Sequence, residues 1–232
     1  MMSSITTLVL AGGMSRRMGQ DKARLVVLEF PLLTQLCLVG LSVSHHVYVV
    51  AGADRDYSDV MPKGCERMID HVVDGPIVAL SNAMTNLIPQ RPNGVNDDWV
   101  LVLACDLPML SSQAVRTWVE RLPELPNGTI AYLPRSEKGW EPLCGFYHLS
   151  AVHSLEPFVA SGQRSFQQWL LQESVAPFVR ELEWDDRQVF LNCNTMSSLD
   201  QIRSSRYQID FIVQHEGPND RNGREDITNL ES

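Results

Sequence analysis

The feature that most constrains the fold is an alternation between short apolar runs and segments with helical spacing. The apolar runs have the length of buried strands, and they cover residues 6–10, 47–50, 99–104, 129–133, 143–147 and 189–191. Helical spacing follows at residues 77–87, behind Pro76, and at residues 114–122, behind Ser111 or Ser112 as the N-cap. Strand followed by helix, repeated along a chain, predicts parallel strand pairing with right-handed crossovers.

The second half of the chain is less regular. Turn residues occur there as Pro-Asn-Gly at 126–128 and Glu-Lys-Gly at 137–139, and these predict a hairpin or an antiparallel addition to the sheet. We therefore expect an α/β fold of three layers, with a mainly parallel sheet and a small antiparallel addition.

The length of 232 residues suits one sizeable α/β core. We assign residues 1–214 to a single domain. Residues 215–232 are polar and nearly free of large apolar side chains. Such a segment cannot bury enough apolar surface to order itself, so we expect a flexible tail.

Charge and cysteine usage restrict the function. The net charge of −9 argues against a broad nucleic-acid surface, which requires clustered Lys and Arg. The five cysteines form no CxxC pair, which favours reduced thiols over a disulfide framework or a zinc site. No apolar stretch approaches the roughly 18 residues of a membrane span, and the first residues lack a basic leader region. We expect a cytoplasmic protein with neither nucleic acid nor membrane as a partner.

A glycine loop directly follows the first apolar run, within LVLAGGMSRRMGQDKARL at residues 8–25. In open α/β sheets, ligands bind at the carboxyl ends of the strands, and the first strand-to-helix loop commonly holds phosphate. Gly12 and Gly13 would let the backbone approach an anion, while Arg16 and Lys22 add positive charge. A glycine-rich turn with solvated arginines is the alternative.

The spacing of this loop excludes two common phosphate motifs. GxxxxGK[ST] fails because two residues separate Gly19 from the following lysine. GxGxxG fails because Gly12 and Gly13 are adjacent and no third glycine follows at the required offset.

One carboxylate follows the predicted strand 99–104. Asp106 precedes Leu107 and Pro108, and the proline ends the strand. A carboxylate at this edge of the sheet, facing the glycine loop, is well placed to hold Mg²⁺. The alternative is an aspartate that caps a turn or a helix.

At these residues the chain resembles a known family. The stretch LAGGMSRRMGQDKA at residues 10–23 is similar to the LAGGxSxRMGxDKA signature of the nucleotidyltransferases that include molybdenum cofactor guanylyltransferase. Further similar motifs follow in the same order, namely DGPIVAL (74–80), ACDLPML (104–110), EPLCGFY (141–147), SGQRSF (161–166) and LNCNT (191–195). The resemblance covers nearly the whole chain except the tail.

The resemblance implies a Rossmann-like nucleotidyltransferase fold and a definite reaction. The enzyme would transfer GMP from GTP to the terminal phosphate of molybdenum-molybdopterin and release pyrophosphate, with Mg²⁺ as the cofactor. Related enzymes that use CTP tend to carry LAAG where this chain has LAGG, and the smaller glycine leaves more room for guanine. The implied partners are GTP, the molybdopterin acceptor and molybdoenzyme maturation proteins.

The resemblance also implies roles for individual residues. The nucleotide would be bound by Leu10, Ala11, Gly12, Gly13, Lys22, Asp70 and Asp106. Lys22, Arg16 and Asp106 would be catalytic, and Asp106 would hold the metal. For Asp70, a plain surface aspartate before a turn is the alternative.

Two amides complete the candidate site. Asn192 and Asn194 have the period-two spacing that places both side chains on one face of a strand. The resemblance implies that they contact the pterin of the acceptor, and the alternative is a pair of turn residues that cap a following helix.

Three other functions stay open on the sequence. The first is a CTP-dependent molybdopterin cytidylyltransferase. The second is a drifted protein that binds nucleotide or cofactor without turnover. The third is a nucleotidyltransferase that acts on a sugar or an isoprenoid precursor. Divalent-metal-dependent pyrophosphate release would exclude the second, and the identity of the acceptor would separate the third.

Overall fold

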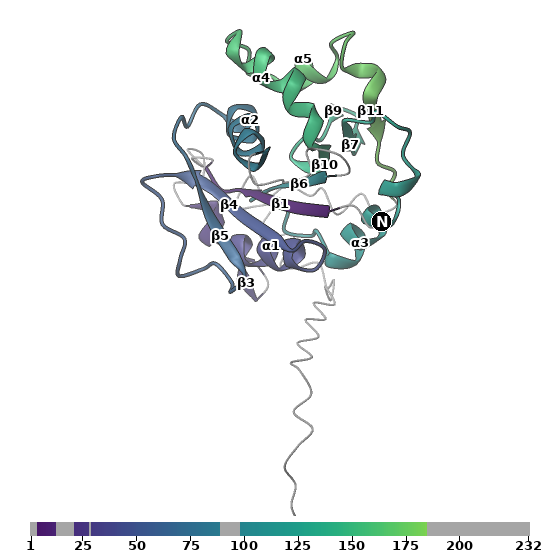
Figure 1. The fold of residues 1–232 in the computed structure, drawn as a ribbon. Helices are drawn as coiled ribbons and strands as arrows, with labels where there is room; N and C mark the ends of the chain where they lie inside the picture. The colour runs from purple at the N-terminus through teal and green to yellow at the C-terminus, as the bar shows by residue number, and fades with distance from the viewer. Residues whose placement is uncertain (1–3, 13–20, 28, 89–97, 185–232) are drawn as a thin grey trace, which may run out of the picture.

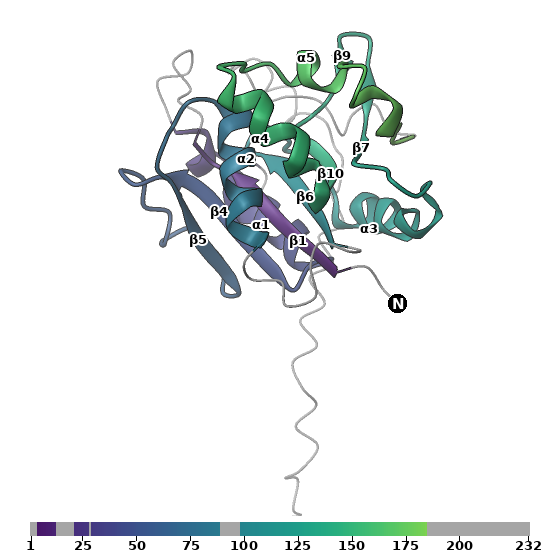
Figure 2. The same ribbon diagram turned by 45° about the horizontal axis from the view of Figure 1, so that its top comes forward.

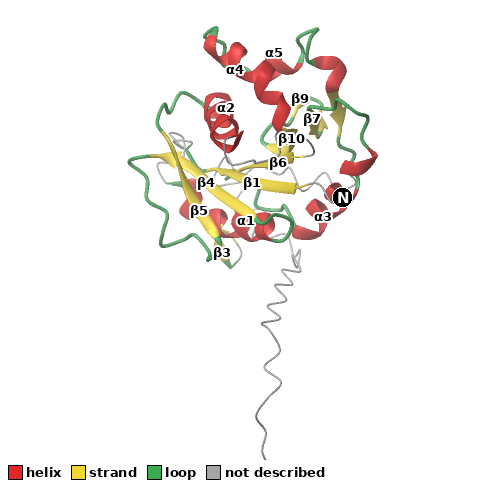
Figure 3. Cartoon of the chain, viewed as in Figure 1, coloured by secondary structure: helices red, strands yellow, loops and turns green. Residues whose placement is uncertain are grey.

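The computed structural model describes residues 4–12, 21–27, 29–88 and 98–184. The strands of the central sheet are β1 (Ser4–Leu10), β4 (His46–Gly52), β5 (Cys65–Asp70), β6 (Asp98–Ala104), β7 (Ala131–Leu133), β10 (Cys144–His148) and β11 (Val179–Glu181). The α-helices are α1 (Leu32–Leu41), α2 (Pro76–Leu87), α3 (Ser112–Glu120), α4 (Val152–Ala160) and α5 (Phe166–Leu170) (Figures 1 and 3). Short two-stranded ladders join β2 (Val26–Val27) to β3 (Phe30–Pro31) and β8 (Arg135–Ser136) to β9 (Gly139–Trp140). Single 3₁₀ turns occur at η1 (Lys22–Arg24), η3 (Leu122–Glu124), η4 (Leu149–Ala151) and η5 (Ala176–Phe178).

Among the described residues, the central sheet has the strand order β11-β7-β10-β6-β1-β4-β5. The pairs β6–β1, β1–β4 and β4–β5 are parallel, and β10 is antiparallel to both of its neighbours. In this register Leu10 lies beside Val50 and Ala104, while Gly52 lies beside Asp70. The carboxyl ends of four parallel strands therefore meet at one edge of the sheet.

Helices cover both faces of the sheet (Figures 1 and 2). On one face, Val9 of β1 belongs to a core with residues of α1 and α3. On the other face, Leu8 belongs to a core with residues of α2, α4 and α5. This alternation of burial along β1 follows from the period of two in a strand, and burial on both faces explains the continuous apolar runs.

Gly40 shows how tightly a helix can approach this sheet. An added Cβ atom at Gly40 of α1 would lie 2.8 Å from the Cγ2 atom of Thr7 on β1. The glycine therefore allows α1 to pack closely against the central strand.

The predicted three-layer α/β/α fold is confirmed, with its antiparallel part at β7, β10 and the β8–β9 hairpin. Helix α2 begins at Pro76, and Ser111 is the N-cap of α3. The sequence did not predict β5 and β11. The predicted strand 189–191 and the predicted tail 215–232 lie outside the described residues. No helix in the described part of the chain has the length and hydropathy needed to span a membrane.

Candidate active site

A pocket of about 250 Å³ opens at the carboxyl edge of the parallel strands. Its lining includes residues at or just after the ends of β1, β5 and β6, Val50 near the end of β4, and the start of α2. This edge is where ligands bind in open α/β sheets, because the connecting loops diverge there and leave a crevice.

The structure brings most of the predicted nucleotide-binding residues together in this pocket. The predicted residues in its lining are Leu10, Ala11, Gly12, Lys22, Asp70 and Asp106. Gly13, Arg16, Asn192 and Asn194 lie outside the described residues. Gly12, just after β1, and Asp106, just after β6, thus line the same pocket, while the role of each residue stays a prediction.

The backbone at the end of β1 leaves room for a ligand. The amide of Ala11 donates to the carbonyl of Val50 at 2.9 Å, which continues the β1–β4 ladder by one residue. An added Cβ atom at Gly12 would meet no atom of the described residues within 4 Å. Packing of the described chain therefore does not require glycine here, and the open space is what close approach of a ligand requires.

Lys22 lines the pocket at the start of η1. The preceding residue, Asp21, is the N-cap, and its Oδ1 atom accepts a hydrogen bond from the amide of Ala23 at 3.1 Å. A side-chain cap satisfies a backbone donor that the turn itself leaves unpaired. The cap therefore fixes the backbone from which the lysine side chain starts.

Asp106 lies in the turn directly after β6. Burial raises the pKa of its carboxyl group above the ordinary value, the positive charge of Lys22 lowers it, and the negative charge of Glu141 raises it again. Burial disfavours the charged form because water no longer solvates it. An ionised Asp106 is thus poorly compensated by the protein, which is an arrangement that a bound cation would relieve.

Asp70 ends strand β5 and is only 8% exposed. Its Oδ1 atom accepts a hydrogen bond from the amide of Val72 at 3.2 Å. Asp70 is therefore buried in the pocket lining rather than placed on the open surface, and it also forms a turn with Val72, so its contact with the nucleoside stays a prediction.

Helix α2 begins at the pocket, since Gly75, Pro76 and Ala79 belong to its lining. Gly75 is the N-cap with φ +89°, a conformation that favours glycine, and Pro76 occupies the first turn. The positive end of the helix dipole therefore faces the ligand space.

Sequence reasoning missed several lining residues. Asp21 had a local signal, since an aspartate directly before a short helix is a typical N-cap. Val73, Cys105 and Leu143 carry no such signal. Burial raises the pKa of the Cys105 thiol well above its ordinary value, so this cysteine is not an activated nucleophile.

The donors in the pocket suit a metal that is shared with a substrate. No group of three or more His, Cys, Asp or Glu side chains suited to hold a metal occurs within the described ranges. Magnesium is commonly bound by one or two carboxylates together with substrate phosphates. The carboxylate of Asp106, with Glu141 close enough to influence its pKa, fits that donor set.

The comparisons with known proteins agree with this geometry. The sequence profile of the MobA-like NTP transferase domain matches residues 7–176. A probable molybdenum cofactor guanylyltransferase from Nostoc sp. is 38% identical over 198 residues, which is 85% of this chain and 90% of that protein. A protein of the same description from Synechococcus elongatus is 35% identical over 192 residues, covering 83% of this chain and 94% of the relative.

The fold is also similar to a solved structure. The crystal structure of molybdopterin-guanine dinucleotide biosynthesis protein A from Archaeoglobus fulgidus matches with a TM-score of 0.66 and 20% identity. The match covers 85% of this chain and 96% of that chain, and it shows a common fold. The profile match and the identity to the cyanobacterial proteins go further, and they show that this chain belongs to the MobA-like NTP transferase family.

Proposed function

We propose that this chain transfers GMP from GTP to the terminal phosphate of molybdenum-molybdopterin and releases pyrophosphate. The observation that carries the proposal is a single pocket that contains the backbone after β1, Lys22 and Asp106. The guanine and molybdopterin assignments are supported by the names of the cyanobacterial relatives, which are described as molybdenum cofactor guanylyltransferases.

In the proposed reaction, an oxygen of the acceptor phosphate attacks the α-phosphorus of GTP. A new bond forms between that oxygen and the α-phosphorus, the bond to the β-phosphate oxygen breaks, and pyrophosphate leaves with the electron pair. Such a displacement needs little covalent chemistry from the protein, because positioning and charge stabilisation carry it.

The proposal assigns a task to several residues of the pocket. The backbone of Ala11 and Gly12 lies against the nucleotide, and the ammonium group of Lys22 stabilises the charge that develops on the leaving pyrophosphate. Asp70, buried at the end of β5, contacts the nucleoside. Outside the described residues, we propose that Gly13 and Arg16 contact the phosphates and that Asn192 and Asn194 contact the pterin.

Asp106 is the proposed ligand of Mg²⁺. A bound Mg²⁺ would neutralise phosphate charge and polarise the reacting phosphoryl group. The carboxylate is suited to this task because burial already disfavours its isolated charge. The metal would then add positive charge beyond that of Lys22.

We also propose that the protein works in the cytoplasm, together with molybdoenzyme maturation proteins. The thiols support the location, because the four cysteines in the described part of the chain are all free thiols. Reduced thiols are typical of that compartment.

The test is pyrophosphate release by the purified protein with Mg²⁺ and GTP, with and without the molybdopterin acceptor. We expect release that requires both the acceptor and GTP, with CTP at least tenfold less effective. Equal rates with CTP would contradict the guanine assignment, and GTP binding without any release would indicate a binding protein.

Lysine variants sharpen this test. We expect Lys22→Met to lower kcat by about 100-fold, a typical effect of removing a positioned charge from a transition state. Lys138→Met is the matched control, because Lys138 is an exposed lysine in the β8–β9 turn outside the pocket. An unchanged kcat for Lys22→Met would remove the lysine from the proposed mechanism.

A further inference from the structure

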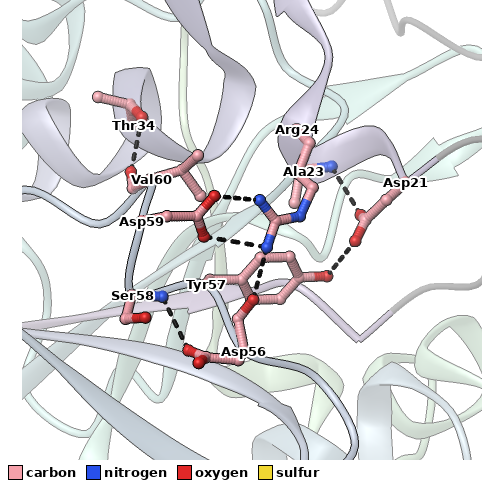
Figure 4. A network of polar contacts seen from close by, with 9 residues as sticks. All are labelled: Asp21, Ala23, Arg24, Thr34, Asp56, Tyr57, Ser58, Asp59 and Val60. Carbon is pink, nitrogen blue, oxygen red and sulfur yellow. Dashed lines mark hydrogen bonds and ion pairs between the residues drawn. The ribbon is translucent and has the colours of Figure 1, made fainter.

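The loop between β4 and β5, residues 53–64, contacts the segment that carries Lys22 (Figure 4). The sequence motifs gave this loop no function, and none of its residues lines the pocket. Its side chains nevertheless bond to two residues that do. We call it the β4–β5 loop below.

Tyr57 of the β4–β5 loop makes the central contacts. Its hydroxyl group lies 2.9 Å from the Oδ2 atom of Asp21 and 3.1 Å from the carbonyl oxygen of Ala11. Both atoms are acceptors, so the hydroxyl hydrogen is shared between them. One buried phenol thus joins the chain just before the glycine loop to the chain just after it.

The same carboxylate receives a second donor. The Nη1 atom of Arg55 lies 3.3 Å from the Oδ2 atom of Asp21 and 3.4 Å from the Tyr57 hydroxyl oxygen. Asp21 therefore uses its Oδ1 atom to cap η1 and its Oδ2 atom to bind the β4–β5 loop.

A third contact holds the far end of η1. The guanidinium group of Arg24 donates to both carboxylate oxygens of Asp59, and its Nη2 atom also donates to the carbonyl of Asp56 at 2.7 Å. Its central carbon lies 5.5 Å from the centre of the Tyr57 ring, a cation–π distance. Both flanks of Lys22, at residues 21 and 24, are thus bound to the β4–β5 loop.

The β4–β5 loop is itself anchored to the hydrophobic core and to α1. Tyr57 is 2% exposed and its ring belongs to the core that packs against α1. The hydroxyl of Thr34 on α1 donates to the carbonyl of Val60 at 2.7 Å. The contacts to Asp21 and Arg24 are therefore made by a loop that is anchored to the main core.

We propose that Tyr57 is a positioning residue for phosphate binding, acting through Asp21 and Ala11 on the lysine and backbone groups that meet the triphosphate. The inference rests on the proposed function of this pocket. A charged side chain binds phosphate well only when the backbone that carries it is fixed beforehand, because ordering that backbone at the moment of binding costs affinity. The Tyr57 hydroxyl supplies that order from outside the pocket.

Tyr57→Phe tests the proposal, because it removes the hydroxyl and keeps the buried ring. The probe is inorganic triphosphate with Mg²⁺, measured by calorimetry, alongside kcat for GTP. We expect the dissociation constant for triphosphate to rise about tenfold and kcat to fall by a similar factor, which is the scale of one lost hydrogen bond to a charged group.

Tyr132→Phe is the matched control. Tyr132 is a buried tyrosine of β7 that does not line the pocket, and burial raises its pKa. We expect this variant to keep triphosphate affinity and kcat within twofold of the wild type, whatever its melting temperature. If both variants weaken triphosphate binding equally, Tyr57 has a structural role only.

The two proposals fail in different ways. If wild-type protein turns over GTP and Tyr57→Phe matches it in both measurements, the positioning role is wrong and the proposed function stands. If wild-type protein binds triphosphate but releases no pyrophosphate, the transferase function fails. The effect of Tyr57→Phe on triphosphate affinity then still decides the positioning role.

Discussion

The pocket has two rims that are held in different ways. The first rim, residues 21–24, is bound by hydrogen bonds and ion pairs to the β4–β5 loop, whose Tyr57 is buried. The second rim, residues 70–75, has an exposed tip, since Val72 and Val73 are 56% and 58% exposed. Near the end of this rim, Asp74 forms a largely exposed ion pair, in which the Nε atom of Arg164 donates to the Oδ2 atom of Asp74 at 2.7 Å.

The second rim also contains backbone strain. Val73 has φ +37°, and it is the one residue other than glycine with positive φ in the described ranges. A β-branched residue in this region is unfavourable, and such strain often occurs at ligand sites. The comparison indicates that the rim proposed to meet phosphate charge is held by side-chain contacts to the β4–β5 loop, whereas the rim beside Asp70 has a strained residue at the surface.

The largest expected effect concerns Asp106, which is coupled electrostatically to the first rim through Lys22. We expect Asp106→Asn to lower kcat at least about 100-fold, because the proposed metal loses its protein carboxylate. The same variant should melt at a higher temperature at neutral pH, since it removes a buried charge whose desolvation the fold compensates only in part.

The pH dependence of that stability difference has a definite sign. Burial raises the pKa of folded Asp106 above 3.8, so the folded protein binds this proton more tightly than the unfolded chain. Wild-type protein therefore recovers stability as the pH falls through the folded pKa. Melting curves of the two proteins, taken without metal, should converge toward pH 4. An Asp106→Asn variant that melts below wild type at pH 7 would contradict this account.

A smaller effect is expected from the strained second rim. Val73→Gly should increase the free energy of unfolding by about 0.5–1 kcal/mol, because relief of about 1–2 kcal/mol of strain exceeds the entropic cost of glycine. Val72→Gly is the control, because it has similar exposure and no positive φ, and it should lower stability by about 0.5–1 kcal/mol. Urea denaturation measures both. Equal losses in the two variants would show that the second rim is unstrained.

The sequence predicted the strands of this fold where burial makes the chain uniformly apolar. Strands β1, β4 and β6 are buried on both faces along most of their length, so each contains a continuous apolar run. Strand β5 lies at the edge of the sheet, and most of its side chains are at least partly exposed, including Glu66 and Arg67. An edge strand with charged side chains has no apolar run to reveal it.

The site was predictable where one motif contains its own chemistry. The glycine loop, Lys22 and Asp106 were found from their positions after apolar runs. Tyr57 was not predicted, because its hydroxyl donates to the carbonyl of Ala11, a residue 46 positions away. Only the pairing of β1 with β4 brings these two residues together. The strain at Val73 also depends on the folded backbone, and no local pattern announces it.

The smallest expected effect separates the ion pair of the first rim from its buried hydroxyl. A side-chain hydrogen bond from Arg24 lowers the pKa of the Asp59 carboxyl below 3.8, so the pair stabilises the protein at neutral pH and this stability is lost as the pH falls through the folded pKa. Both side chains are substantially exposed, so the effect should be small and sensitive to salt.

Asp59→Asn should therefore melt slightly below wild type at pH 7 in low salt, and the difference should vanish as the pH falls through the folded pKa of Asp59 and in 1 M salt. Asp54→Asn removes the same charge from the same loop and keeps the Arg24–Asp59 ion pair, so it is the control for loss of charge alone. A difference for Asp59→Asn that persists in acid would mean that the first rim depends on the shape of this side chain. If the difference follows the charge while triphosphate affinity stays within twofold, the Arg24–Asp59 ion pair supports only the fold, and the phosphate side is ordered by the contacts to Asp21 and Ala11 instead.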